Sequence, residues 1–431
     1  MISLKSKRLP VNTGIHLLPT SKFKTTLVSV SLQQVLNRES AAQTALLPAV
    51  LKRGTKQYPT LRDLEIRLEE LYGATLTADV VKRGERQILT FSLEVINDKF
   101  APGENLLQQG LSILKEVIGT PLLENGGFHK DYVRQEKEQL AREIQGLVND
   151  KVNYALERCV QEMCSGERFG VYKYGSVEEL QPITSGGLYD YYREILRGNP
   201  LDIFVVGEVD IEETFSLIRE TFDFGRSSEP VKLPPVRVEC APERVSYEEE
   251  KLPVNQGKLT LGYRTNLSYS DGKYLDLLFY NGVLGGFPHS KLFQNVREKA
   301  SLAYYVFSRL EKHKGIQLIG SGIEVKDYRQ ALDIILQQVD AVKKGQISRE
   351  EMENTRRGII NRLKIIGDSP YSLVGYYLDG LIGGRPEERT EELIRKVERI
   401  TKDDVVAVAE NIHLDTVYFL RSTDEEEGEA N

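Results

Sequence analysis

Hydrophobic and polar positions in the first half of the chain follow the periods of strands and helices in turn. The pattern predicts, in order, a strand, two helices, a pair of strands and another helix, over residues 25–32, 41–51, 61–72, 74–96 and 105–118. A long charged helix over 131–147 comes next. Further on, a helix over 188–196 leads into an apolar strand over 201–207.

The second half repeats this order of elements. Its pattern predicts a strand, two helices, paired strands, a helix and a long charged helix, over residues 258–263, 274–283, 290–298, 303–323, 328–342 and 348–365. A helix over 405–411 and a strand over 416–420 close this half as they close the first. The repeat predicts an α+β protein of two tandem homologous domains, each a mostly antiparallel sheet covered by helices on one face.

The proline pattern between the two copies predicts where one domain ends and the other begins. Four prolines lie between residues 227 and 242, which is typical of an extended surface linker. We therefore expect an N-terminal domain over 1–226, a linker over 227–250 and a C-terminal domain over 251–423. Residues 424–431 form an acidic tail with the composition of a disordered segment.

Charge and composition favour a cytoplasmic protein. The chain has 57 basic and 64 acidic residues and a net charge of -7, which disfavours nucleic acid or an anionic membrane as a partner. The N-terminus has no apolar core of a signal peptide, and no run of 18 apolar residues follows. Three cysteines agree with a reducing compartment.

The histidines and cysteines do not have the spacing of a metal or nucleophile site. The closest two of the five histidines, His289 and His313, lie 24 positions apart, so neither H-E-x-x-H nor H-x-x-E-H occurs. Cys159 and Cys164 are five positions apart and Cys240 is isolated, which indicates buried thiols. No Ser–His or Cys–His constellation is visible that would support hydrolysis without zinc.

Three segments carry a family resemblance that covers nearly the whole chain. Leu51–Pro59, Leu68–Ala74 and Leu292–Tyr304 resemble the pitrilysin/insulinase family of inverted-motif zinc peptidases, and its processing-peptidase branch in particular. In active members of that family, H-x-x-E-H lies just before the segment that matches Gly54-Thr55. The resemblance implies the two-domain peptidase fold.

The resemblance places the zinc ligands and the general base on residues that cannot serve as either. Aligned on Gly54-Thr55, the two histidines fall on Ala45 and Ala49, and the glutamate base falls on Pro48. Proline has no ionisable group, and we expect it to disturb the helix that carries these positions. The chain should therefore hold no zinc and cleave no peptide by itself.

Two glutamates stand where the family has its third zinc ligand. Glu136 and Glu143 are seven positions apart, so two helical turns can point both carboxylates the same way. The resemblance assigns Glu143 to the ligand position by its Arg-Glu-Ile context. The alternative is a solvated amphipathic helix, which is favoured because a carboxylate without histidines makes a poor zinc site.

The second half retains a pair of residues that active relatives use. The resemblance implies that Arg297 and Tyr304, seven positions apart, hold the substrate backbone and stabilise charge at the scissile carbonyl. Guanidinium and phenol groups both donate hydrogen bonds to carbonyl oxygens. The alternative is an arginine near a helix C-terminus and a tyrosine that begins a strand.

Two functions are compatible with these residues. In the first, the chain is the non-catalytic subunit of a heterodimeric zinc metallopeptidase. A partner of similar length carries H-x-x-E-H and zinc, and this chain closes the chamber and supplies Arg297 and Tyr304 to the peptide substrate. In the second, it is an inactive scaffold or peptide-binding protein of the same family. A homodimer remains open.

Overall fold

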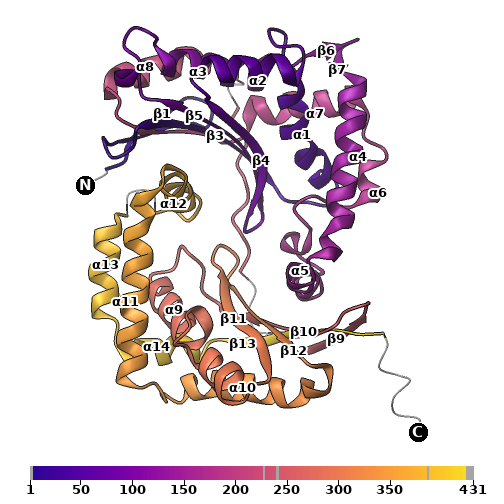
Figure 1. Cartoon of the computed structure of the whole chain (residues 1–431), viewed down its shortest axis with the longest axis vertical. Coiled ribbons are helices and arrows are strands. Elements are labelled where there is room, and N and C mark those ends of the chain that lie inside the picture. Colours follow the sequence, from indigo (N-terminus) through magenta and orange to yellow (C-terminus); the bar gives the residue numbers. More distant parts are fainter. Residues whose placement is uncertain (1–2, 227–228, 239–241, 386–387, 424–431) are drawn as a thin grey trace. The chain divides into compact units, whose positions relative to one another are not determined.

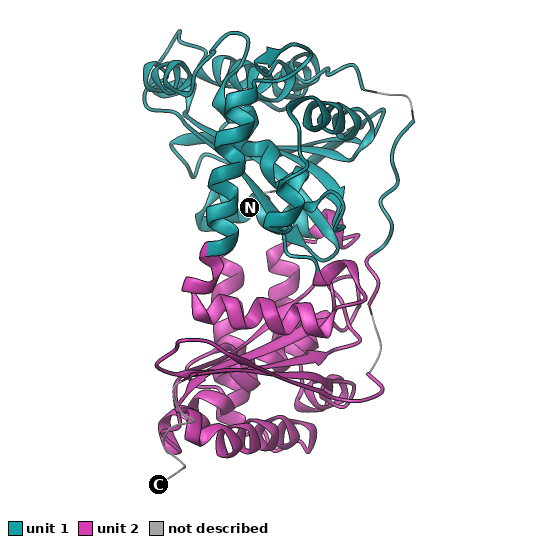
Figure 2. Ribbon diagram, turned by 90° about the vertical axis from the view of Figure 1, so that its right-hand side faces the viewer, with its two compact units in different colours: residues 1–145, 171–235, 367–379 teal, residues 146–170, 236–366, 380–431 magenta. Residues whose placement is uncertain are grey.

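The protein consists of two compact units. A computed structural model describes residues 3–226, 229–238, 242–385 and 388–423. Unit 1 comprises residues 1–145, 171–235 and 367–379, and unit 2 comprises 146–170, 236–366 and 380–431 (Figure 2). The two units are thus interleaved along the chain. The predicted division into two consecutive domains joined by a linker at 227–250 did not include this interleaving. The predicted acidic tail and parts of the predicted linker lie outside the described residues.

Unit 1 contains a six-stranded sheet with the order β1-β2-β8-β3-β5-β4 (Figure 1). Its strands, in chain order, are β1 (Lys5–Leu9), β2 (Thr13–Pro19), β3 (Thr25–Val35), β4 (Thr75–Arg83), β5 (Arg86–Ile96) and β8 (Leu201–Gly207). The pair β2–β8 is parallel, and the other neighbours are antiparallel. A separate two-stranded ribbon pairs β6 (Leu123–Glu124) with β7 (Gly127–Phe128).

Helices pack on one face of this sheet. They are α1 (Ala41–Arg53), α2 (Leu61–Glu70), α3 (Leu106–Gly119), α4 (Lys130–Gly146), α6 (Val177–Leu180), α7 (Ser185–Gly198) and α8 (Ile211–Thr221). Capping boxes fix the start of α2, at Thr60 and Asp63, and of α6, at Ser176 and Glu179. Strand residues such as Val28, Val30 and Phe91 form the core with these helices. The alternation of side chains along a strand therefore sends the intervening residues to the other face.

That second face of the unit 1 sheet is polar. Ser29 and Ser92 are buried and share a hydrogen bond of 2.8 Å. Residues 367–379 return to unit 1 on this side, and they include the start of α12 (Pro370–Ile382). Lys22 donates to the carbonyl of Gly367 at 2.7 Å, and Arg83 pairs with Asp379 at 3.0 Å. Buried polar groups must find hydrogen-bond partners. A polar sheet face of this kind can therefore hold reactive side chains close together.

Unit 2 contains a five-stranded sheet with the order β11-β12-β10-β13-β9. Its strands are β9 (Ser246–Lys251), β10 (Gly257–Arg264), β11 (Ala303–Glu311), β12 (Ile316–Ile323) and β13 (His413–Arg421). The pair β13–β9 is parallel and the other pairs are antiparallel. This order and pairing match β4-β5-β3-β8-β2 of unit 1 strand by strand, so the predicted α+β class with two homologous halves is confirmed. Strand β1 is the one described strand of the unit 1 sheet without a counterpart.

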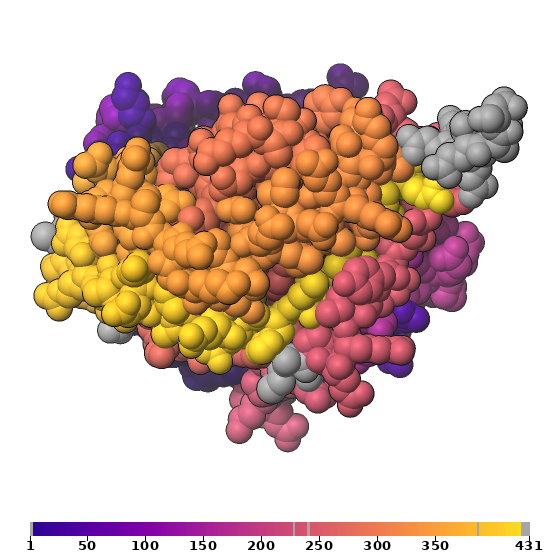
Figure 3. Space-filling view, turned by 90° about the horizontal axis from the view of Figure 1, so that it is seen from below, coloured from indigo at the N-terminus to yellow at the C-terminus, as the bar shows by residue number. Residues whose placement is uncertain are grey.

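Helices also cover the sheet of unit 2. They are α5 (Lys151–Met163), α9 (Tyr274–Asn281), α10 (Tyr328–Lys343), α11 (Arg349–Ile365), α13 (Thr390–Arg399) and α14 (Lys402–Ala409). Two π-helical segments, η4 (Gly282–Gly286) and η5 (Phe293–Lys299), follow α9. Orange and yellow segments, from the last part of the chain, cover much of the face drawn in Figure 3. Across the described ranges, each helix is too short or too polar to cross a bilayer.

Helix α5 joins unit 2 although it belongs to the first half of the sequence. It packs on the sheet face opposite α9 and α10 (Figure 1), where Met163 and Cys159 lie against Gly262 of β10. A buried ion network fixes the end of this segment. The Arg264 guanidinium contacts Glu167 at 2.6 Å and Asp415 at 2.8 Å, and the Lys314 ammonium contacts Glu167 at 2.5 Å. This network ties the α5 segment to three parts of the unit 2 sheet.

Limited trypsin digestion should first cut the extended connection after Lys232. Lys232 is exposed, and residues 229–238 form neither helix nor strand. Because α5 packs in unit 2 and residues 367–379 pack in unit 1, each fragment keeps part of the other's unit. We therefore expect fragments 1–232 and 233–431 to co-elute on gel filtration and to separate in denaturant. A first cut within 61–118 would contradict the division.

Candidate functional site

Helix α1 carries the positions that the family resemblance assigns to zinc ligands and base. Ala45 and Pro48 are buried and Ala49 is exposed. The helix is continuous through Pro48, from Ala41 to Arg53, so the prediction that the proline disturbs it was wrong. The reason is packing: nine of the helix residues are buried, and their burial can outweigh the hydrogen bond that proline lacks.

These positions line one cavity of unit 1, which we call the α1–α4 cavity. Its volume is about 280 Å³. Its walls come from α1, from residues 78–80 of β4, from α4 and from Tyr174. The α4 residues at the wall include both predicted carboxylates, Glu136 and Glu143. The structure therefore brings Ala45, Pro48, Ala49, Glu136 and Glu143 together, as the resemblance implied.

Zinc does not fit this cavity. Glu136 is buried, and its carboxylate accepts a hydrogen bond from the Arg53 guanidinium. Glu143 is exposed and accepts from the Gln139 amide at 3.2 Å. The alanine methyl groups and the proline ring offer no lone pair to a metal. Among the residues that the structure describes, no group of three His, Cys, Asp or Glu side chains is placed to hold an ion.

Purified protein should contain no stoichiometric zinc and should cleave no peptide. The reason is that the α1–α4 cavity has a carboxylate already paired with Arg53 and no imidazole beside it. Metal analysis after dialysis, together with a peptidase assay, checks this. One tightly bound zinc per chain, lost to a chelator together with peptidase activity, would show that the site lies elsewhere.

Arg297 and Tyr304 are both exposed in unit 2. The Arg297 guanidinium lies 4.6 Å from the Phe293 ring centroid and 3.9 Å from Glu298. Tyr304 on β11 is 55% exposed, and its hydroxyl donates to the Glu324 carboxylate. This hydrogen bond, reinforced by the charge of Glu324, raises the pKa of Tyr304. Both side chains thus present hydrogen-bond donors at the surface of unit 2.

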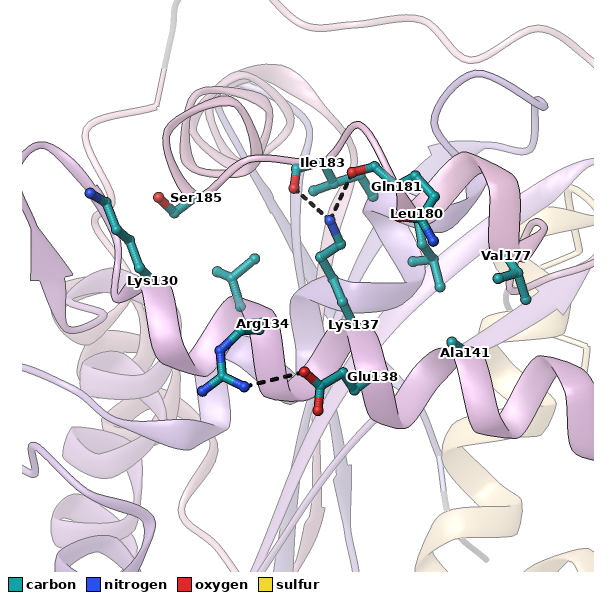
Figure 4. A pocket seen from close by; sticks show the side chains of 11 residues that line it. Lys130, Arg134, Lys137, Glu138, Ala141, Val177, Leu180, Gln181, Ile183 and Ser185 are labelled. Atoms are coloured by element: carbon teal, nitrogen blue, oxygen red, sulfur yellow. Dashed lines mark hydrogen bonds and ion pairs between the residues drawn. The ribbon is translucent and has the colours of Figure 1, made fainter.

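A second cavity, the α4–α6 groove, lies on the other side of α4. Its volume is about 310 Å³, and Val177 and Leu180 are among its apolar lining residues (Figure 4). The Lys137 ammonium crosses it and donates to the carbonyls of Gln181 and Ile183, both at 3.0 Å. Lys137 therefore acts here as a link between α4 and the chain after α6.

Sequence reasoning missed a serine, histidine and aspartate that the unit 1 sheet brings together. Ser6 Oγ lies 2.9 Å from His16 Nδ1, and His16 Nε2 lies 3.0 Å from Asp202 Oδ1. Ten and 186 positions separate His16 from its two partners, so no local motif marks them. One signal was present: Asp202 is a charged residue inside the apolar strand 201–207.

The comparisons agree with this geometry. A family model described as the peptidase M16 inactive domain matches residues 182–359. The chain is 39% identical over 412 residues to the probable inactive metalloprotease YmfF of Bacillus subtilis, covering 95% of this chain and 96% of that protein. It is 22% identical over 320 residues to the mitochondrial-processing peptidase subunit beta of Saccharomyces cerevisiae, covering 70% and 67%.

A solved structure shows the same fold over the whole chain. The crystal structure of a conserved protein from Enterococcus faecalis matches with a TM-score of 0.90 at 28% identity, covering 97% of this chain and 99% of that one. Fold and site together define a peptidase homologue in which alanine stands at both histidine positions of the metal site. The chain belongs to the peptidase M16 family. The predicted resemblance to the pitrilysin/insulinase family is thereby confirmed.

Proposed function

We propose that this chain is the non-catalytic subunit of a heterodimeric zinc metallopeptidase. A family member of similar length would carry H-x-x-E-H and the zinc. This chain would close the chamber and present Arg297 and Tyr304 to the backbone of the peptide substrate. Zinc would thus be a cofactor of the partner and not of this chain.

The observation that carries the proposal is the contrast between the two units. Unit 1 has alanine at both histidine positions, Ala45 and Ala49, and proline at the position of the base, Pro48, whereas unit 2 keeps Arg297 and Tyr304 exposed. Exposed donors of this kind suit a carbonyl oxygen that gains negative charge. The similar yeast protein is named as a subunit of a processing peptidase, which supports a division of labour between chains.

The alternative is an inactive scaffold or peptide-binding protein of the same family. One observation favours it: the Tyr304 hydroxyl donates to Glu324, so the phenol already has an acceptor within unit 2. In the heterodimer, a substrate carbonyl would have to replace Glu324 as that acceptor.

Reconstitution distinguishes the two functions. The chain is mixed with a family member from the same genome that carries H-x-x-E-H, and the mixture is analysed by gel filtration and by peptide hydrolysis. We expect a 1:1 complex with zinc-dependent activity that neither chain shows alone. A complex without activity would support the scaffold, and no complex with any such relative would contradict the heterodimer.

We also propose that the protein works in the cytoplasm. Cys159 is a buried free thiol, and burial raises the pKa of Cys159. Such a thiol is stable in a reducing compartment, which supports this location.

A further inference from the structure

The outer edge of the unit 1 sheet carries the array of Ser6, His16 and Asp202. We propose that it is a second site, in which Ser6 is a nucleophile activated by His16 and takes an acyl group from small esters. It does not depend on the proposed peptidase function. It is also separate from the α1–α4 cavity, none of whose lining residues belong to the array.

Strand register places the three side chains on one face. Ser6 of β1 lies opposite His16 of β2, and on the next strand Gly14 and His16 of β2 lie opposite Asp202 and Phe204 of β8. Residues directly opposite or two positions apart share a face of the sheet. This face is the polar one, and β1 is the strand that unit 2 does not repeat. The array is therefore a feature of unit 1 alone among the described strands.

The hydrogen bonds set the direction of proton transfer. Asp202 accepts from His16 Nε2 at 3.0 Å and from the Gln33 amide nitrogen at 2.8 Å. An ionised carboxylate can only accept, so in the proposed site, with a neutral His16 ring, the proton lies on Nε2 and the Nδ1 lone pair faces the Ser6 hydroxyl at 2.9 Å. Arg86 donates to the Gln33 oxygen at 2.7 Å, which fixes the orientation of that amide. His16 is thus held as a base directed at Ser6.

The surroundings hold the imidazole in place and leave the serine open. The His16 ring stacks on Phe204 with centroids 4.7 Å apart. A Cβ atom at Gly14 would come within 2.5 Å of both His16 Nε2 and Asp202 Oδ1, so glycine makes room for their hydrogen bond. His16 and Asp202 are 1% and 2% exposed, whereas Ser6 is exposed on the edge strand. A substrate can therefore reach Ser6 while His16 keeps its buried contacts with Asp202 and Phe204.

The chemistry follows from this arrangement. Ser6 Oγ attacks the ester carbonyl carbon and its proton passes to His16 Nδ1. The ester C–O bond then breaks, and the departing alcohol oxygen takes the proton from His16. Water attacks the acyl-Ser6 ester by the same route, which releases the carboxylic acid and restores Ser6. Nδ1 faces the nucleophile here, whereas Nε2 does so in serine proteases, but either nitrogen can relay the proton. Asp202 is a positioning residue that stabilises the imidazolium.

A fluorophosphonate tests the site on the full-length protein. Its phosphorus forms a bond to Ser6 Oγ, fluoride leaves and His16 takes the proton. We expect one adduct per chain, mapped to Ser6 by mass spectrometry, and slow hydrolysis of p-nitrophenyl acetate. Ser6→Ala should abolish both. The matched control is Ser246→Ala, because Ser246 begins edge strand β9 and donates to the Glu248 carboxylate with no imidazole partner; it should change neither.

His16→Asn separates an activated serine from an ordinary one. Loss of a general base typically slows such a step about 10² to 10⁴-fold, and we expect that loss in the labelling rate of Ser6. Circular dichroism checks that the variant is folded. The proposal is overturned if the fluorophosphonate does not label Ser6 in the folded wild-type protein, whether or not His16→Asn folds. It is also overturned if folded His16→Asn is labelled at the wild-type rate.

Discussion

Arg297→Ala or Tyr304→Phe should slow peptide hydrolysis by the proposed heterodimer about 10² to 10³-fold, because each removes a donor that the proposed function directs at developing negative charge. Both side chains are exposed, so fold and subunit association should survive, as is usual for surface substitutions. The measurement is kcat/KM of the reconstituted complex, taken after gel filtration confirms assembly.

Matched variants on the same unit serve as controls. Arg309 and Tyr247 are exposed on β11 and β9, and neither belongs to the predicted pair. Arg309→Ala and Tyr247→Phe should therefore leave kcat/KM near the wild-type value. Glu143→Gln in unit 1 should do the same, because Glu143 has no metal to bind. Wild-type rates for both Arg297→Ala and Tyr304→Phe would remove the accessory role and leave the scaffold.

The repeat in the sequence was enough to predict the paired sheets, because each half has its own alternation of strands and helices. The interleaving of the units was not predictable. Residues 151–163 look like any amphipathic helix, and only tertiary packing against Gly262 on β10 shows that α5 belongs to unit 2. The π-helical form of 293–299 was also hidden, because the apolar pattern there is that of an ordinary helix.

The candidate site was likewise predictable from the sequence only in part. The family motif located Ala45, Pro48 and Ala49 and the two glutamates, since local spacing on two helices determines them. The pairing of Arg53 with Glu136 was not visible, because it joins residues 83 positions apart. The Ser6 array depends on sheet register across three strands, which no local pattern encodes. Contacts between segments that are distant in the chain could therefore not be predicted from the sequence.

Glu167→Gln should lower the free energy of unfolding of unit 2 by about 3–5 kcal/mol, the usual result of removing one partner from a buried ion network. Lys314 is 1% exposed and Arg264 is 4% exposed, and both contact the Glu167 carboxylate. Neutralising it leaves two buried cations with Asp415 as their remaining carboxylate within this network. Urea unfolding followed by far-UV circular dichroism measures the change, because the chain has no tryptophan.

The pH dependence and a double variant test the same network. Burial alone would raise the pKa of Glu167, but its bonds to Arg264 and Lys314 hold that pKa below the ordinary value. Its contribution is therefore complete above about pH 4.3, the unfolded-state pKa, and is lost as the pH falls through the lower folded-state pKa. Lys314→Met in the Glu167→Gln background should recover part of the loss, since it removes a buried charge that has lost its Glu167 carboxylate. The control is Arg309→Ala, which breaks an exposed pair and should change the free energy of unfolding by less than about 0.5 kcal/mol. If Glu167→Gln changes stability no more than this control, the network does not hold the α5 segment in unit 2.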